Sequence, residues 1–142
     1  MRTFTHLEIS ILGVEKYRKT ALTSAQVLVF NGTFETLEGP KSFVKGDYLC
    51  IGVQGEAWPM KKASFEADKE YVKESRDGFR VYRTKSLKNA VFIPEQFTLQ
   101  LDGEPMVSKP EGGYIVYGGN PARAWICDKD IFEESYKLER TS

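Results

Sequence analysis

Short apolar runs, interrupted by turns, recur along the chain and predict strands. Near the N-terminus Leu7, Ile9 and Ile11 alternate with polar residues, which indicates a strand within residues 1–16. Two later runs are almost continuously apolar, a pattern typical of strands that are buried on both faces. These runs are residues 48–53 and 114–117, and each follows a turn that contains glycine.

Two further segments have the spacing of a short helix rather than that of a strand. They are residues 64–72 and 130–138. In the second segment Phe132 and Tyr136 are four residues apart and share one helical face, and Asp128 or Asp130 can cap its start. The helical pattern of the first segment is weaker. We therefore expect a mainly β chain with a minor helical part.

The chain repeats itself once. When the first half is shifted by 63 to 67 residues, many of its glycine and aromatic positions fall on the same residue type in the second half. The matched pairs include Tyr17 with Tyr82, Phe34 with Phe97, Gly46 with Gly112, Trp58 with Trp125, and Phe65 with Phe132. A chance match would not keep these residues in order with so little drift. The sequence therefore predicts a tandem duplication.

The duplication predicts a fold class and a division of the chain. We expect two tandem units related by a pseudo-twofold axis, each a small β-barrel or β-roll closed by a short helix, plus an extra N-terminal strand. The expected segments are 1–16 for that strand, 17–75 for the first repeat, 76–81 for a linker and 82–142 for the second repeat. Each repeat has about 60 residues, a size at which a lone core is marginal. We therefore expect the repeats to pack as one compact domain.

The composition of the chain limits the kinds of partner and the cellular compartment that we expect. The 142 residues carry 20 Lys and Arg against 20 Asp and Glu, so no overall field steers the chain toward nucleic acid or an anionic membrane. Apolar residues make up 41% and charged residues 28%, which argues against disorder. No stretch approaches the roughly 18 apolar residues of a membrane helix, and no secretory cleavage pattern is visible. We expect a cytoplasmic protein with no membrane partner.

The residue types that carry most catalytic and metal chemistry are scarce. Two cysteines and one histidine cannot build a disulfide framework or a four-ligand zinc site. Cys50 is matched by Val116 in the other repeat and Cys127 by Met60, so both are interpreted as small buried apolar residues. No common nucleophile, metal or phosphate-loop motif is present. We expect no catalytic residues, no metal site, no cofactor and no enzymatic activity.

The two tryptophans are candidate binding residues. Each lies among charged residues, and either could form a stacking platform or cover the core of its own repeat. We favour the core, because tryptophan at matched positions indicates a requirement of the fold. The speculative binding set around the first is Glu56, Trp58, Lys61 and Lys62, and around the second Arg123 and Trp125.

One local charge bias points to a different partner. Residues 73–88 contain six basic and two acidic residues, a local balance of +4. With Phe79 and Tyr82 nearby, Arg80 and Arg83 could hold single-stranded nucleic acid. A solvated linker is the simpler interpretation, because the whole chain has no net charge.

Two stretches of the chain are similar to a family pattern. The segments GDYLCIGVQGEAWPMKKASFEADKEY and GGYIVYGGNPARAWICDKDIFEESY resemble small phage and prophage proteins of unknown function. Those proteins have a Pro-Gly-Asp-Tyr turn, then Gly-Glu, an aromatic-Pro pair and a closing Phe-Glu-x-x-Tyr. Here Lys45 replaces the proline in the first copy and Gly113 replaces the aspartate in the second. The resemblance implies a phage or prophage accessory protein and implies no catalytic residues.

Two functions are consistent with these observations. The first is a non-enzymatic interaction module that binds a host protein or a small ligand. The second is a nucleic-acid-binding protein that uses residues 73–88. We favour the first, because the duplicated β units are rich in aromatic residues and contain no recognisable catalytic set.

Overall fold

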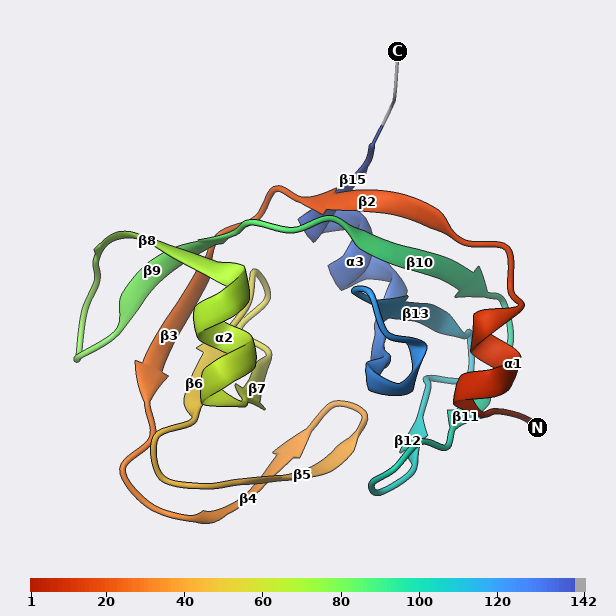
Figure 1. The fold of residues 1–142 in the computed structure, drawn as a ribbon, viewed down its shortest axis with the longest axis horizontal. Coiled ribbons are helices and arrows are strands. Elements are labelled where there is room, and N and C mark those ends of the chain that lie inside the picture. The colour runs from red at the N-terminus through yellow and green to blue at the C-terminus, as the bar shows by residue number, and fades with distance from the viewer. Residues whose placement is uncertain (140–142) are drawn as a thin grey trace. The chain divides into compact units, whose positions relative to one another are not determined.

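The computed structural model describes residues 1–139 and is mainly β. The chain forms two compact units (Figure 1). Unit 1 consists of Met1–Arg18 and the part that begins at Leu87, and unit 2 is Lys19–Ser86. Residues 76–81, expected to link the two repeats, belong to unit 2.

Unit 2 has a five-stranded antiparallel sheet, a helix and a separate hairpin. The sheet contains, in spatial order, β7 (Ala57–Met60), β6 (Tyr48–Ile51), β3 (Thr23–Val27), β9 (Arg80–Thr84) and β8 (Lys69–Glu74). Helix α2 (Lys62–Asp68) covers one face of this sheet, and β4 (Gly32–Thr36) and β5 (Gly39–Phe43) form the hairpin.

Unit 1 has two sheets. The larger contains β14 (Trp125–Cys127), β13 (Gly113–Tyr117), β10 (Lys88–Ile93), β2 (Glu15–Lys19) and β15 (Tyr136–Leu138), in that spatial order. Helix α3 (Lys129–Ser135) lies on one face. The smaller sheet contains β1 (Arg2–Phe4), β11 (Phe97–Leu99) and β12 (Met106–Val107) and is joined by helix α1 (His6–Ser10) and the 3-10 turn η1 (Pro121–Arg123).

Each five-stranded sheet includes one strand from the other half of the sequence. Strand β2 pairs with β10, with Tyr17 opposite Lys88, and β9 pairs with β3, with Tyr82 opposite Thr23 (Figure 1). The chain reaches β9 through a tight turn at Asp77 and Gly78, whose φ angles of 56° and 80° are those of an Asp-Gly hairpin. Because of this turn, β8 and β9 form one hairpin over residues 69–84 inside unit 2.

In unit 2 the pairing of β9 completes an aromatic stack against the helix. The Phe65 ring of α2 stacks on Tyr48 at a centroid distance of 3.8 Å and meets the edge of Tyr82 at 4.8 Å. The Tyr48 hydroxyl donates to Glu66 over 3.3 Å. Burial and this carboxylate raise the pKa of Tyr48.

In unit 1 the pairing of β2 completes a similar stack. Phe132 of α3 stacks on Tyr114 at 3.9 Å and meets the edge of Tyr17 at 4.8 Å. The Tyr114 hydroxyl donates to Glu133 over 3.2 Å, and burial together with this carboxylate raises the pKa of Tyr114 to about 12. In both units the tyrosine of the incoming strand therefore helps to hold the helix on its sheet.

Two expectations about the fold are wrong. Residues 6–10 form helix α1, and only Arg2–Phe4 is a strand in this segment. Thr5 and Glu8 match the Thr-x-x-Glu start signal of a helix, the Thr5 hydroxyl donates to Glu8 over 3.1 Å, and the helical turn brings Ile9 into the core. Residues 1–139 contain no closed barrel, because both five-stranded sheets end in edge strands.

The tryptophans occupy matching places in the two sheets. Trp58 lies opposite Cys50 and Trp125 lies opposite Val116, and both are half-buried. Trp58 packs against the cluster under α2, with the Lys19 ammonium 5.1 Å from its ring centroid. Trp125 contacts both core clusters of unit 1. The two tryptophans therefore occupy equivalent positions, but Trp125 packs against more of the core than Trp58 does.

The strand pairing predicts an effect on the opposite half of the sequence. Tyr17→Ala should destabilise β10 and β13 of unit 1 by about 2 kcal/mol, because a half-buried ring is lost from the stack on Phe132. Tyr82→Ala should do the same to β3 and β6 of unit 2. Amide hydrogen exchange of the full chain measures each effect. Faster exchange in β3 and β6 of the Tyr17→Ala protein would contradict this pairing.

The tryptophans should differ in their contribution to stability. Trp125→Ala should lower the free energy of unfolding by about 3 to 5 kcal/mol, because the ring fills space in two clusters. Trp58→Ala should cost less, because this ring packs against one. Thermal melts of the two variants check the order. If Trp58→Ala lost as much stability as Trp125→Ala, or more, the extent of packing would not determine the loss.

Candidate functional site

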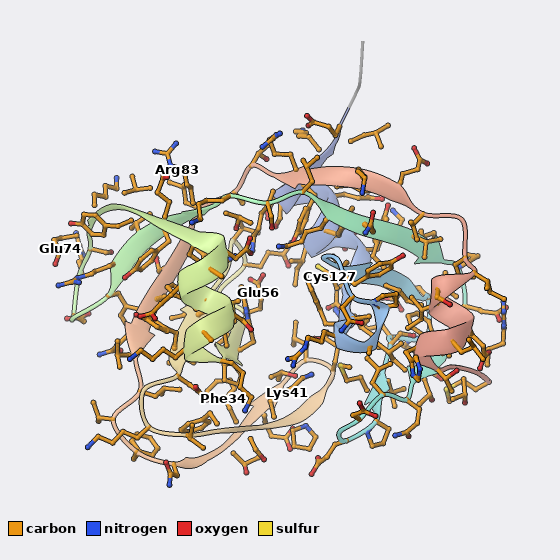
Figure 2. The ribbon with its side chains drawn as sticks, in the orientation of Figure 1. Phe34, Lys41, Glu56, Glu74, Arg83 and Cys127 are labelled. Atoms are coloured by element: carbon orange, nitrogen blue, oxygen red, sulfur yellow. The ribbon has the colours of Figure 1, made fainter. Side chains whose placement is uncertain are left out.

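Glu56, a candidate binding residue, stabilises its own hairpin. Its carboxylate accepts the backbone N–H of Gln54 over 2.9 Å, and Gly55 takes the positive φ of 79° that the turn requires. The Gly52 N–H also donates to the Glu56 backbone oxygen over 2.9 Å. Glu56 therefore acts in the connection between β6 and β7 (Figure 2).

Lys61 borders a shallow pocket in unit 2. The pocket has a volume of about 160 Å³ and is lined by residues of β5, β7 and the turn before β6, namely Lys41, Ser42, Asp47, Pro59, Met60 and Lys61. The buried Asp47 carboxylate accepts the backbone N–H groups of Val44 and Lys62 over 3.0 and 3.1 Å. It therefore fixes the turn and the start of α2, and the lysines supply the positive charge of the pocket.

Lys41 is a candidate that the sequence analysis did not select. It lies opposite Phe34 in the β4–β5 hairpin, and Figure 2 shows both side chains there. Burial lowers the pKa of Lys41, while Glu38 partly opposes this shift. The available signal was its position two residues before Phe43, since alternate strand residues share a face and Phe43 is buried. Lys41 therefore places an amine against a partly apolar face.

The remaining tryptophan-linked candidates are not gathered into one site. Lys62 and Arg123 have exposed side chains, Lys62 at the start of α2 in unit 2 and Arg123 in the η1 turn of unit 1. Trp58 is approached by Lys19, and Trp125 packs against core residues. The structure therefore brings Lys61 together with Lys41 and leaves the other members of the set dispersed.

Arg80 and Arg83 each pair with a glutamate of the neighbouring strand. Arg80 lies 3.1 Å from Glu74 and Arg83 lies 3.3 Å from Glu70. The arginines are three positions apart on β9, so their side chains leave opposite faces of the sheet. Of the other basic residues in this strip, Lys88 is buried in unit 1. The strip is therefore divided between two faces and partly neutralised.

The face of the unit 2 sheet opposite α2 is only partly covered. Tyr48 and Cys50 of β6 point toward the helix, so Leu49 and Ile51 lie on the opposite face, where both are half-buried. Burial on both faces, expected for this strand, is only partial here, because Cys50 alone of its four residues is fully buried. The same expectation is confirmed in unit 1, where Ile115, Val116 and Tyr117 of β13 are all buried.

The difference between the sheets has a cause in the sequence. The corresponding face of unit 1 is covered by the smaller sheet and α1, and Phe4 and Ile9 of the first fourteen residues are fully buried there. The residues 65 positions later, 66–79, lie in α2, β8 and the hairpin turn of unit 2. Unit 1 has α3 and β15 in the matching places, so β1 and α1 are additional elements of unit 1 without a counterpart among the described elements of unit 2.

Exposed apolar side chains lie along two adjacent segments of unit 2. They are Val27 at the end of β3, Val29 and Phe30 in the segment that follows it, and Val44 after β5, each more than two-fifths exposed. The segments run together, because the Leu28 N–H donates to the Asp47 carbonyl over 2.7 Å and the Gly46 N–H to the Leu28 carbonyl over 2.8 Å. The Phe30 ring lies 5.5 Å from that of buried Phe43. We call these four residues the valine patch.

The burial of Cys50 and the placement of the metal-ligating residue types bear on nucleophilic and metal chemistry. Cys50 is fully buried, and desolvation raises its pKa to about 12, so the thiolate nucleophile is not formed near neutral pH. Among residues 1–139, no group of three or more His, Cys, Asp or Glu side chains is placed to hold a metal ion. Within the same residues, no helix is both long and apolar enough to span a bilayer.

Three features of unit 2 are candidates for binding. Two lysines line a small pocket, an apolar sheet face is half-covered, and the valine patch is exposed. We compared the chain with protein-family models, with curated protein sequences and with solved structures, and nothing in any of the three matches it.

Proposed function

We propose that the protein is a non-enzymatic interaction module that binds a protein partner through unit 2. The observation that carries this proposal is the half-covered sheet face around Leu49 and Ile51, whose counterpart around Ile115 in unit 1 is buried. This half-buried face and the exposed valine patch together leave apolar area on unit 2 that a partner protein can cover. The valine patch extends the apolar surface of the same unit.

The pocket favours a protein over a small ligand. Its volume of about 160 Å³ is below the roughly 300 to 1,000 Å³ of a typical small-molecule site. One side chain fits such a volume. A partner side chain that enters it meets the amines of Lys41 and Lys61.

We propose that the two units arose by a tandem duplication in which the first strand of each repeat pairs with the sheet of the other repeat. Three observations support it. The two sheets use corresponding strands in the same order, Phe65 and Phe132 each meet two tyrosines from matching strands, and the tryptophans lie at matching places. A phage or prophage source stays a prediction that rests on the resemblance of sequence motifs. An accessory protein that binds a host protein is consistent with this surface.

Binding of nucleic acid through residues 73–88 has less support. Such binding needs a continuous basic surface with accessible rings. Arg80 and Arg83 point to opposite faces and each has a glutamate within 3.3 Å. We therefore keep this function as an alternative that a direct binding assay decides.

Site-specific photo-crosslinking tests the proposed interaction surface. Benzoylphenylalanine placed at Phe30 in the valine patch should give a discrete protein adduct in the cells that naturally produce the chain. The matched control is the same residue at Ile11 in unit 1, which is equally apolar and 81% exposed. Adducts at neither position, or equal adducts at both, would contradict a binding surface on unit 2.

A second variant ties the adduct to the sheet face. Ile51→Lys places a charge on the half-covered face and should reduce the Phe30 adduct about tenfold, because a buried unpaired ammonium opposes docking. A thermal melt shows whether the variant is folded. An unchanged adduct in a folded Ile51→Lys protein would separate the valine patch from the sheet face and remove the observation that carries the proposal.

The alternative predicts a different result. If residues 73–88 bind single-stranded nucleic acid, affinity should fall steeply with salt and fall again in the Arg80→Ala, Arg83→Ala double variant. We expect neither effect at physiological salt, because both arginines are paired with glutamate. Fluorescence anisotropy with labelled oligonucleotides measures it. Salt-dependent binding that the double variant abolishes would favour the nucleic-acid function.

A further inference from the structure

The hairpin of unit 2 has an outer edge with backbone groups available for pairing. Within the described residues β4 pairs with β5 alone. Glu35 lies opposite Pro40, which has no N–H, so this is a non-hydrogen-bonded pair of the antiparallel ladder. The N–H and C=O of Glu35, and those of Thr33 two residues earlier, therefore point away from β5. The N–H and C=O groups of Gly32, Phe34 and Thr36 point toward β5.

Unit 1 shows what lies against the same edge there. Its hairpin strand β11 corresponds to β4 through the matched Phe97 and Phe34, and it pairs with β1 on its outer side. This pairing is parallel, with Arg2 opposite Phe97 and Phe4 opposite Leu99. The next strand residue confirms the direction, because the Gln100 N–H donates to the Phe4 carbonyl over 2.9 Å.

The added strand completes the core of unit 1. Phe4 is fully buried and meets the Phe97 ring edge-on at 5.6 Å. The chain then turns into α1, which buries Ile9 in the same cluster. In unit 2 the matched Phe34 is only half-buried, and the sheet face below is half-covered. Strand β1 and helix α1 therefore cover a part of unit 1 that has no counterpart among the described elements of unit 2.

The charges of unit 2 specify the segment further. Lys41 lies opposite Phe34 where unit 1 has Ser108 opposite Phe97. A residue added beside Phe34 on the outer edge would share its row with Lys41 and point to the same face. In unit 1 that outer position is occupied by Arg2, which would repel an amine. A carboxylate at this position complements Lys41 and Lys61.

We propose that β4 accepts an extended segment of a partner protein as an added parallel strand, with an acidic residue beside Phe34 and an apolar residue two positions later. This inference rests on the proposed function, since it names the kind of partner that unit 2 binds. Backbone pairing supplies affinity, and the alternate side chains that reach Lys41 and the sheet face supply specificity.

Hydrogen exchange with a defined probe tests the added strand. The probe is a synthetic peptide of residues 1–14 with Arg2→Glu, which keeps the segment that covers unit 1 and adds the carboxylate. With the full chain at saturating peptide, exchange of the Thr33 and Glu35 amides should slow by about tenfold or more. The amides of Gly32, Phe34 and Thr36 should change little, because they already face β5. This alternation is the signature of a strand at the outer edge.

Matched variants separate backbone pairing from side-chain effects. Glu35→Pro removes the outward N–H and should abolish peptide binding, whereas Glu35→Ala keeps the N–H and should bind like the parent. If Glu35→Pro fails to fold, the exchange pattern of the parent chain decides alone. The Arg2→Glu peptide should bind about threefold or more tighter than the unmodified one, and Lys41→Met should remove this advantage.

Three outcomes would overturn the inference. Uniform protection of β4, or none, would exclude strand addition, and the proposed function would survive if the Phe30 adduct is still formed. Binding that persists in a folded Glu35→Pro protein would exclude backbone pairing. Protection of Thr33 and Glu35 that rises with the concentration of the chain alone would identify a second copy as the occupant.

Discussion

The pairing of β2 with β10 and of β9 with β3 is the constraint on which the rest of the structure depends. Each pairing places a tyrosine, Tyr17 or Tyr82, at the edge of a helix phenylalanine, and the helix is held on the sheet by that contact. A sheet without the incoming strand would lack this ring. The helix phenylalanine would keep only its stacked partners, Tyr48 in unit 2 and Tyr114 with Tyr136 in unit 1.

A small change in sequence use separates the two units. Fourteen residues at the N-terminus give unit 1 a strand and a helix that bury Phe4 and Ile9. The residues at the corresponding distance, 66–79, lie in α2, β8 and the turn before β9, and unit 1 has α3 and β15 in the matching places. Both large sheets therefore have five strands, and unit 2 keeps one sheet face half-covered. The proposed binding surface follows from that difference and needs no special residue beyond Lys41.

Local patterns predicted the strand-rich fold and most turns, because these depend on neighbouring residues. Gly46, Gly55 and Gly112 adopt the positive φ expected of turn glycines. The alternation of Leu7, Ile9 and Ile11 misled, because three alternating apolar residues also suit one helical turn, and Thr5 with Glu8 favours the helix. The Asp77-Gly78 turn was a local signal that would have placed residues 76–81 in a hairpin.

The candidate site was harder to predict than the fold, because burial and pairing depend on residues far apart in sequence. Glu56 and Arg83 were candidates because they are charged residues near aromatic ones. In the structure Glu56 closes its own turn, and Arg83 pairs with Glu70. Lys41 had no distinguishing motif, and its importance arises from the hairpin that places its amine beside Phe34.

The sequence by itself determined most strands, the glycine turns and the matched positions of the aromatic residues, since these follow from local periodicity and from comparison along the chain. The tertiary structure alone decided which strand pairs with which and which sheet face is covered. Both depend on contacts between residues more than fifty positions apart, such as Tyr17 with Lys88, and no local pattern encodes the partner of an amphipathic strand. The exchanged strands and the open edge of β4 are therefore properties of the folded chain.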